Sequence, residues 1–480
     1  MMNLQSKTPL YDKLISHNHS NPISFHVPGH KNGAIFHEKG VSTYSNLLKL
    51  DVTELSGLDD LHSPEGVILE AKQLLASLYQ VERSYFLVNG STVGNLVMIL
   101  AAVNEGDIVL VQRNCHKSIL NGLQLSGAKP VFISPEFNEN WHVAAGPTVA
   151  SIRLALELYP DAKALIVTYP NYYGMVYNLG DMIELAHRNN IPILVDEAHG
   201  AHFIAGEPFP ASAVSLGADM VVQSAHKTLP ALTMSSFLHY NSQLISQKKV
   251  EKYLHILQSS SPSYPLMASL DLARSYLGTL TLRDRQYLNE QIQRFREGLG
   301  QLPGIRVLTY ENDAGDLLKI TIQSTVGLSG FALQEIFEQA GMFAELADPI
   351  NLLLIVPLLK DGMEFPFAEV LNMLNRLLAE QEQQVVNVTE EYPAFYKKEI
   401  SLLELSFAEM DKRECTQICF DQAIGKICAE MIIPYPPGVP LLFPGEMITE
   451  GDMAQILWHI NKGTRFQGGE LLKKGYIMVF

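Results

Sequence analysis

Apolar runs separated by helix-length segments constrain the fold of this 480-residue chain more than any other feature. Seven short runs recur along the chain, at residues 84–88, 107–111, 130–133, 164–168, 191–195, 219–223 and 235–239. Strands buried on both faces have this apolar character, and their alternation with helices is typical of a parallel, doubly wound sheet. The sequence therefore predicts an α/β fold whose large domain holds a seven-stranded, mostly parallel sheet.

Changes of pattern along the chain predict how it divides into domains. The first part is rich in His, Asn, Gly and Pro and shows little periodicity, whereas shorter strands and helices alternate again after the large sheet. The predicted parts are an N-terminal arm with loops (1–65), a large cofactor-binding domain (66–295), a small α+β domain (296–390) and a C-terminal domain (391–480).

Composition limits which binding partners and which cellular compartment are expected. The formal net charge of -16 argues against a nucleic-acid partner, because binding phosphates needs clustered Lys and Arg. The N-terminus has no apolar signal core and the run at 96–103 is too short to span a bilayer, so no membrane partner is expected. The four cysteines form no CxxC pair, which indicates a reducing compartment and predicts a cytoplasmic protein; Cys415 and Cys419 are expected in the core.

Two side chains with complementary chemistry follow neighbouring runs of the predicted sheet. Asp196 comes directly after the run at 191–195, and Lys227 lies four residues beyond the run at 219–223. Ligand-binding side chains of open α/β sheets gather just past such strand ends. A carboxylate there can keep a pyridinium nitrogen protonated, and a lysine can form an imine with an aldehyde. Either residue alone is more often a helix cap or a surface lysine, but together they predict a site for pyridoxal 5'-phosphate (PLP).

The loop Asn89-Gly-Ser-Thr-Val-Gly-Asn95 follows the first strand and precedes an apolar helix. Hydroxyls and free amides at a helix N-terminus bind anions, although the same residue types are also common helix caps. In combination with Lys227, the loop is predicted to hold the phosphate of the cofactor. The residues predicted to donate to that phosphate are Gly90, Ser91, Thr92, Ser224 and His226.

Histidines in two further segments were weighed as site residues. His116 follows the second strand, where its flat ring could stack on the cofactor; the alternative is an ordinary hydrogen-bonded loop histidine. His26 and His30 stand four apart, which suggests a metal site. Pro28 and Gly29 between them prevent the helix that would bring both rings to one face, and no carboxylate completes a ligand set, so no metal is predicted.

Six motifs stand in one order along nearly the whole chain: His26–Lys31, Asn89–Thr92, Asp196–His202, Ser224–Lys227, Ser261–Ser269, and Pro434–Pro440 with Pro444–Glu446. In these motifs the chain resembles the Orn/Lys/Arg decarboxylase family of fold type I PLP enzymes, in a short form without a separate N-terminal regulatory domain. The resemblance implies a decarboxylase of a basic L-amino acid. Arginine, giving agmatine and CO2, is favoured over lysine and ornithine on the resemblance alone.

The resemblance also implies roles for individual residues. Lys227 would carry the cofactor, Asp196 would pair with the ring nitrogen, and His226 or Lys227 would return a proton to the product. The active site of this family lies at a dimer interface, so a homodimer or an assembly of dimers is expected. Residues implied to contact cofactor or substrate in addition are Ala198, His199, Ser259 and Ser260, the last two from the neighbouring subunit, and Glu446 near the substrate.

Other functions of the same fold stay open at this point. An aminotransferase or aldolase would keep Lys227 and Asp196, but no arginine is clearly placed to clamp an α-carboxylate. A PLP-binding regulatory protein without turnover would also keep the pocket. A nicotinamide-binding enzyme is disfavoured, because the loop at 89–95 lacks the GxGxxG spacing.

Overall fold

The computed structural model describes residues 3–311, 314–381, 398–435 and 439–480. Contacts within the chain group it into two compact units, each made of segments far apart in the sequence. The first unit comprises residues 1–102, 192–207 and 211–281, and the second comprises 103–191, 208–210 and 282–480. The predicted boundary near residue 390 lies outside the described residues, and the four-part division stays a prediction.

The first unit carries seven helices and four strands among its described residues. Its helices are α1 (Pro9–His19), α2 (Glu38–Leu48), α3 (Val67–Tyr79), α4 (Gly90–Ala102), α8 (Ala225–Thr228), α9 (Gln247–Leu257) and α10 (Tyr264–Gly278). Its strands are β1 (Arg83–Leu87), β7 (Ile193–Asp196), β8 (Met220–Gln223) and β9 (Ser236–Tyr240).

The N-terminal residues of this unit contain more regular structure than the sequence analysis expected. Helix α1 begins with Pro9, which suits the first turn because its fixed φ is compatible with a helix. Leu10 and Leu14 are buried, and α1 packs against α3 and α10. Two buried leucines one turn apart give too weak a periodic pattern to be recognised in so polar a segment.

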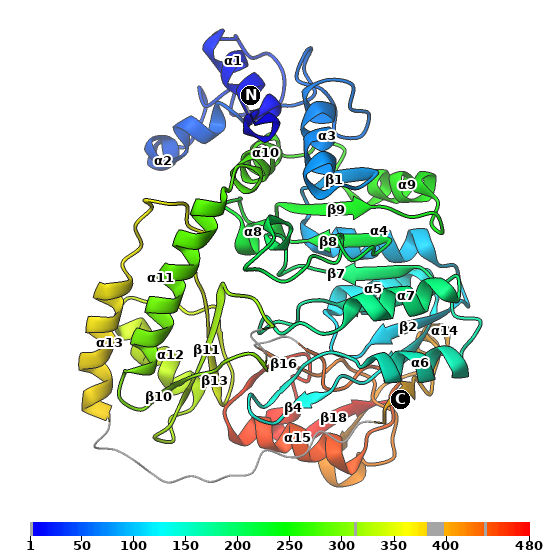
Figure 1. Ribbon diagram of the computed structural model, residues 1–480. Helices are drawn as coiled ribbons and strands as arrows, with labels where there is room; N and C mark the ends of the chain where they lie inside the picture. Colours follow the sequence, from blue (N-terminus) through cyan, green and yellow to red (C-terminus); the bar gives the residue numbers. More distant parts are fainter. Residues whose placement is uncertain (1–2, 312–313, 382–397, 436–438) are drawn as a thin grey trace. The chain divides into compact units, whose positions relative to one another are not determined.

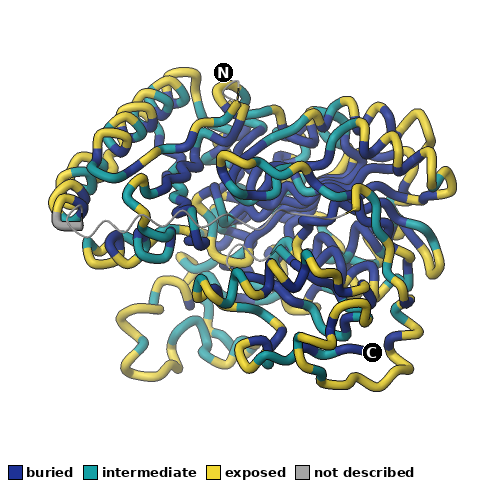
Figure 2. Tube along the Cα trace, turned by 90° about the horizontal axis from the view of Figure 1, so that it is seen from below, coloured by how far each residue is buried: buried dark blue, intermediate teal, exposed yellow. Residues whose placement is uncertain are grey.

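Four strands of the first unit pair in the order β1, β9, β8 and β7. The β7–β8 pair is parallel, whereas β9 runs antiparallel to both β8 and β1. Strands β7, β8 and β9 are buried along their whole length, which explains their largely apolar sequences. Buried stretches of the chain are dark blue in Figure 2. Helix α4 lies against this sheet and contacts β1, β7, β8 and β9 (Figure 1).

The second unit contains the remaining elements. Its helices are α5 (Lys117–Ser126), α6 (Val149–Leu158), α7 (Leu179–Arg188), α11 (Leu282–Gly300), α12 (Gly330–Gln339), α13 (Phe367–Gln381), α14 (Phe407–Met410) and α15 (Glu450–Asn461). Its strands are β2 (Ile108–Gln112), β3 (Lys129–Ile133), β4 (Phe137–Asn138), β5 (Val143–Ala144), β6 (Ala164–Thr168), β10 (Ile305–Val307), β11 (Lys319–Ser324), β12 (Leu346–Ala347), β13 (Asn351–Ile355), β14 (Ile400–Leu402), β15 (Thr416–Cys419), β16 (Ile433–Tyr435), β17 (Arg465–Gln467) and β18 (Tyr476–Val479).

Parallel pairing dominates the large strands of the second unit. Strand β2 pairs in parallel with both β3 and β6, and β14 adds an antiparallel strand beside β3. A separate antiparallel sheet has the order β10, β11, β13 and β12. All seven predicted runs are strands. The sequence analysis did not find β14, because three residues that are not buried carry no apolar pattern.

Two details of the second unit bear on the sequence predictions. Cys415 and Cys419 are exposed free cysteines, so their predicted place in the core is wrong; Cys419 ends the exposed strand β15 instead of lying on a helix. Residues 436–438, inside the motif Pro434–Pro440, lie outside the described residues.

Residues 3–311, 314–381, 398–435 and 439–480 hold neither a membrane-spanning helix nor a metal-ion cluster. Among the helices that the structure describes there, none combines the length and apolar character needed to cross a bilayer. The same ranges contain no group of three or more His, Cys, Asp and Glu arranged to hold a metal ion. His30 instead pairs with Asp51, at 3.0 Å between Nε2 and Oδ2.

Candidate active site

Lys227 lies in the short helix α8, directly after strand β8. Its Nζ is 3.0 Å from Nε2 of His199, which is buried in the loop after β7. An ammonium has donors but no lone pair, so His199 accepts through Nε2 when Lys227 is charged. The fold of this unit therefore brings together Lys227 and His199, two residues that the sequence analysis placed in separate motifs.

Asp196 is the last residue of β7, and its carboxylate is held on both oxygens. Oδ1 accepts from the backbone N–H of Ala198 at 3.2 Å, and Oδ2 accepts from Nδ2 of Asn95 at 2.9 Å. Asp196 and Asn95 are both almost completely buried. A buried carboxylate needs such donors to stay charged, and a charged carboxylate is what a pyridinium nitrogen requires.

Two serines from different elements meet at the start of helix α4. The Ser224 hydroxyl donates to Oγ of Ser91 at 2.8 Å. Gly90 begins α4 with a φ of +76°, a conformation that glycine adopts without strain, and its N–H donates to the carbonyl of Met234. Thr92 is exposed on the first turn. Hydroxyls beside the free N–H groups of a helix N-terminus suit a phosphate.

His226 is oriented by the backbone that follows it. Its Nδ1 lies 3.0 Å from the carbonyl oxygen of Ser235, and its own N–H donates to the same oxygen. A carbonyl can only accept, so Nδ1 carries the proton. In the neutral ring Nε2 then carries no proton and can accept a hydrogen bond, and it donates when the imidazole is protonated.

Glu197 is a functional candidate that the sequence analysis missed. It is fully buried, and its carboxylate accepts from the N–H of Ala213 at 2.6 Å and from Nε2 of Gln223 at 2.6 Å. Gln223 in turn lies 3.1 Å from Nε2 of His239. Burial raises the pKa of Glu197 to about 8 and lowers the pKa of His239 to about 3. The sequence did indicate that Glu197 and Asp196 have different surroundings, because consecutive residues of a strand point to opposite faces.

Two predicted site residues lie in the second unit. His116 caps the N-terminus of α5, where Nδ1 lies 2.8 Å from the Ser118 hydroxyl. Glu446 is buried and pairs with Arg113 through both oxygens; the Nη2–Oε2 distance is 2.7 Å. The second oxygen also accepts from the N–H of Phe443. Contact of Glu446 with substrate stays a prediction, and its observed partner is an internal arginine.

The predicted serine pair at the end of α9 is exposed in the first unit. The Ser259 hydroxyl donates to the carbonyl of Ser261, and the carbonyl of Ser259 lies 2.9 Å from Nε2 of His62. Ser260 is also exposed. Nearby, the side chain of Gln258 holds this segment to strand β1 by accepting from the N–H of Val88. The two serines are thus presented to solvent from an anchored segment.

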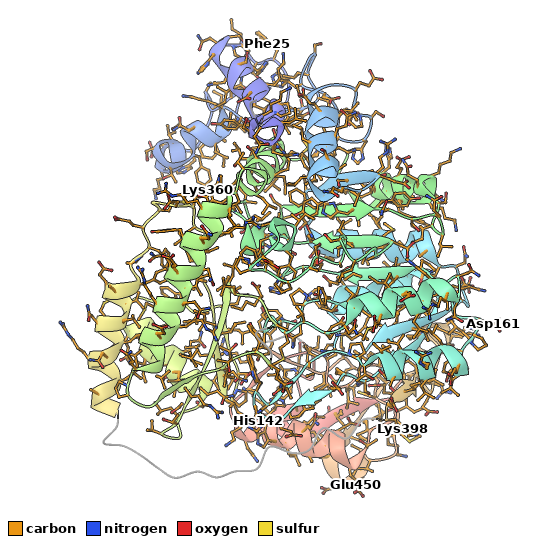
Figure 3. The ribbon with its side chains drawn as sticks, viewed as in Figure 1. Phe25, His142, Asp161, Lys360, Lys398 and Glu450 are labelled. Carbon is orange, nitrogen blue, oxygen red and sulfur yellow. The ribbon has the colours of Figure 1, made fainter. Side chains whose placement is uncertain are left out.

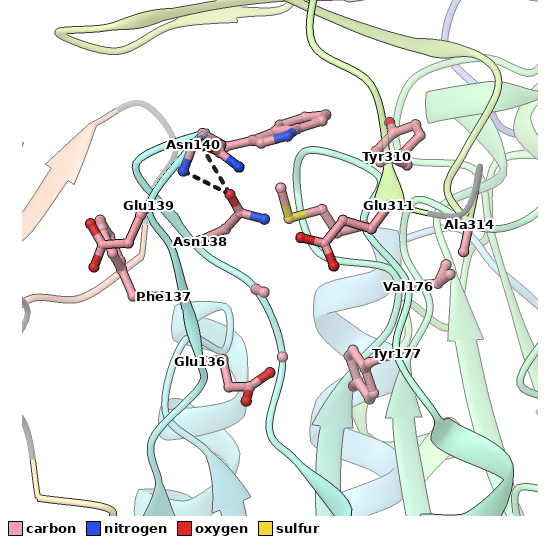
Figure 4. Close-up of a pocket in the computed structure, with 14 residues that line it drawn as sticks. Glu136, Phe137, Asn138, Glu139, Asn140, Val176, Tyr177, Tyr310, Glu311 and Ala314 are labelled. Carbon is pink, nitrogen blue, oxygen red and sulfur yellow. Dashed lines mark hydrogen bonds between the residues drawn. The ribbon is translucent and has the colours of Figure 1, made fainter.

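The second unit also has a pocket of about 700 Å³. Its lining includes Trp141, Tyr177 and Tyr310, and the carboxylates of Glu136 and Glu311 point toward its space from opposite sides (Figure 4). The Tyr177 ring packs against Gly146, where any Cβ would lie 2.1 Å from the ring. None of the residues predicted for the cofactor or substrate site is among its lining residues.

The residues of the first unit fit PLP. A lysine for the aldehyde, a carboxylate for the ring nitrogen and paired hydroxyls at a helix N-terminus for the phosphate are the three anchors that this cofactor needs. Asp196 keeps donors on both oxygens, and one face of α4 reaches both Ser224 and Asp196. Fold and site together define a fold type I PLP enzyme.

Comparisons with known proteins identify the family within that class. The family model for the Orn/Lys/Arg decarboxylase major domain matches residues 8–314, and the model for the C-terminal domain of these enzymes matches 386–466. The chain therefore belongs to the Orn/Lys/Arg decarboxylase family, and it is a lyase whose cofactor is PLP. This agrees with the family that its motifs resemble.

Individual relatives cover nearly the whole chain. The uncharacterized protein YaaO of Bacillus subtilis is 45% identical over 479 residues, with 98% of each chain covered. The arginine decarboxylase of Halalkalibacterium halodurans is 35% identical over 482 residues, covering 98% of this chain and 96% of the relative. The crystal structure of the Francisella novicida lysine decarboxylase LdcF matches with a TM-score of 0.82 at 22% identity, covering 98% of this chain and 81% of that one. The structural match confirms the predicted α/β fold.

Proposed function

We propose that this lyase decarboxylates a basic L-amino acid, with arginine as preferred substrate and agmatine and CO2 as products. The observation that carries the proposal is the placing of Lys227, Asp196 and the Ser91–Ser224 pair in one compact unit. Arginine is favoured because full-length relatives at 35% identity are arginine decarboxylases. The net charge of -16 also favours the approach of a cationic substrate.

The side chains divide the work of the reaction among them. Bound PLP supplies an electron sink for the bond between Cα and the carboxylate. Lys227 would hold the cofactor through its aldehyde, and its Nζ would supply a proton to Cα of the substrate. His199, 3.0 Å away, orients that amine. Asp196 keeps the ring nitrogen protonated, and Ser91 and Ser224 hold the phosphate.

Replacing Lys227 tests the assignment. Lys227→Ala should remove the visible absorbance of lysine-bound PLP and reduce CO2 release from arginine by at least about a thousandfold, because both covalent anchoring and proton transfer are lost. Lys248→Ala, an exposed lysine of α9, is the matched control and should behave as wild type. An unchanged absorbance band in Lys227→Ala would disprove the assignment.

The substrate is tested by measuring products. Purified protein with added PLP is supplied separately with arginine, lysine and ornithine, and CO2, the amine and any keto acid are quantified. Arginine should give the largest kcat/KM, with agmatine and CO2 in equal amounts. Keto acid in place of CO2 would indicate an aminotransferase, and binding of PLP without any product would indicate a regulatory protein.

We also propose that the enzyme is a cytoplasmic homodimer or an assembly of dimers. Large apolar side chains are exposed along residues 23–47, among them Ile23, Phe25 and Ile35. Phe25 is 93% exposed. Figure 3 labels it close to helix α1. Such a run of exposed apolar side chains is unusual on a monomer and suits a subunit interface. The exposed free cysteines Cys415 and Cys419 support a reducing compartment.

A further inference from the structure

We propose that Asn95 is a positioning residue, which holds the Asp196 carboxylate in place so that the ring nitrogen of bound PLP stays protonated. The inference rests on the proposed function and adds a residue to it. Nδ2 of Asn95 donates to Oδ2 of Asp196 at 2.9 Å. Asn95 is 1% exposed and Asp196 is 2% exposed, so water does not replace this contact.

The position of Asn95 on helix α4 relates the two ends of the cofactor site. Ser91 and Asn95 are four residues apart, so they lie on one face of the helix, about 6 Å apart along its axis. Ser91 meets Ser224 after strand β8, and Asn95 meets Asp196 at the end of strand β7. A single helix face therefore supplies a partner to the phosphate end and to the ring-nitrogen end.

Gly94 allows α4 to come close enough for these contacts. A Cβ at this position would lie 2.3 Å from Cγ2 of Val222 and 2.8 Å from Cδ1 of Leu87. No residue larger than glycine fits between the helix and these two strands without a shift. The sequence Gly94-Asn95 thus combines close approach of the helix with an amide directed at the carboxylate.

The chemistry of the contact explains why an amide is needed. Asp196 also accepts from the N–H of Ala198, so the protein supplies one donor to each oxygen. Each carboxylate oxygen has a second lone pair, which remains for a pyridinium N–H. Removing the amide would leave Oδ2 without its side-chain donor, so the carboxylate would no longer be held in one orientation and would accept less well from the ring nitrogen.

The test uses the full enzyme loaded with PLP labelled with ¹⁵N at the ring nitrogen. Asn95→Leu keeps the number and branching of the heavy side-chain atoms and has no donor. We expect its ¹⁵N chemical shift to move toward that of neutral pyridine and kcat to fall about tenfold to a hundredfold, as for the loss of a hydrogen bond to a charged group. Ser91→Ala is the matched comparison from the same helix face; it should weaken PLP binding and leave the ¹⁵N shift at its wild-type value.

A second variant guards against a folding failure. Asn95→Ala removes the donor and adds no volume, so it cannot fail by overfilling the site. Its ¹⁵N shift should move in the same direction as that of Asn95→Leu. If wild type binds PLP and releases CO2 while both variants keep the wild-type ¹⁵N shift and kcat, Asn95 does not have the proposed role, but the proposed function stands. If wild type itself neither binds PLP at Lys227 nor releases CO2, the proposed function falls.

Discussion

Two adjacent carboxylates, Asp196 and Glu197, illustrate how burial decides charge. Asp196 is the last residue of strand β7 and Glu197 follows it directly. Glu197 accepts from Ala213 and Gln223, and also from the Ser212 hydroxyl at 2.9 Å. Those donors favour its charged form, but burial is the larger effect and raises its pKa to about 8. Glu197 therefore holds a proton at neutral pH in the folded protein.

Glu197 should make the stability of the protein fall as the pH rises. Its pKa is about 8 in the folded state against an ordinary 4.5, so between these values the folded state holds a proton that the unfolded chain releases. The free energy of unfolding then decreases from about pH 4.5 to about pH 8. His239, with its pKa lowered from 6.5 to about 3, acts oppositely, and only below about pH 6.5.

Between pH 6.5 and 8 Glu197 should still change its charge in the folded protein, whereas His239 should not. Urea unfolding of Glu197→Gln should show a flatter dependence over that window than wild type, because the amide does not titrate. Glu157→Gln, at an exposed position of α6, should keep the wild-type slope. Equal slopes for wild type and Glu197→Gln would contradict the assignment of the proton to Glu197.

Candidate site residues at strand ends could be predicted from the sequence. Their hydrogen-bond and ion-pair partners, which lie far away in the sequence, could not. Lys227 and Asp196 each follow an apolar run, so their place in the fold follows from strand–helix alternation. Asn95 was recognised only as part of a loop of capping residues, because its partner lies about a hundred residues away. The ion pair of Glu446 with Arg113 joins positions even farther apart, and no local pattern reports such a pair.

At the scale of elements, strand patterns were predictable and close approaches were not. Continuous apolar runs mark β7, β8 and β9 because both faces of these strands are buried. Helix α4 is apolar on most of its surface, so its sequence does not indicate which side faces the sheet. Only the structure shows that Gly94 lies too close to Val222 and Leu87 for a larger residue.

Gly94→Ala should separate α4 from the sheet. Ala favours a helix over Gly by about 1 kcal/mol, but inserting a methyl group into a packed core costs about 1–3 kcal/mol, so we expect net destabilisation. The displaced helix should also weaken PLP binding. Gly300→Ala at the end of α11 is the control, because its Cβ would make only an ordinary contact at 4.0 Å with Val307. Thermal unfolding and PLP titration of both variants measure the effect; a fully wild-type Gly94→Ala would refute it.

At the scale of the whole molecule, the exposed serines Ser259 and Ser260 link the active site to the assembly of subunits. A single subunit presents them to solvent at the end of α9, although the Gln258 side chain anchors the segment to β1. In the proposed dimer they donate to the phosphate in the neighbouring subunit. Each active site then combines Lys227 of one subunit with the serine pair of the other, and no subunit completes a site alone.

Mixed dimers test this sharing. One subunit carries Lys227→Ala, and the other carries Ser259→Ala with Ser260→Ala. If the sites are shared, a hybrid dimer has one site with both lesions and one intact site. Random mixing of equal amounts makes about half of the dimers hybrids, so about a quarter of wild-type activity should return at limiting PLP. If each subunit uses its own serines, every site keeps a lesion and mixing restores nothing. The same preparations combined without subunit exchange provide the baseline for CO2 release.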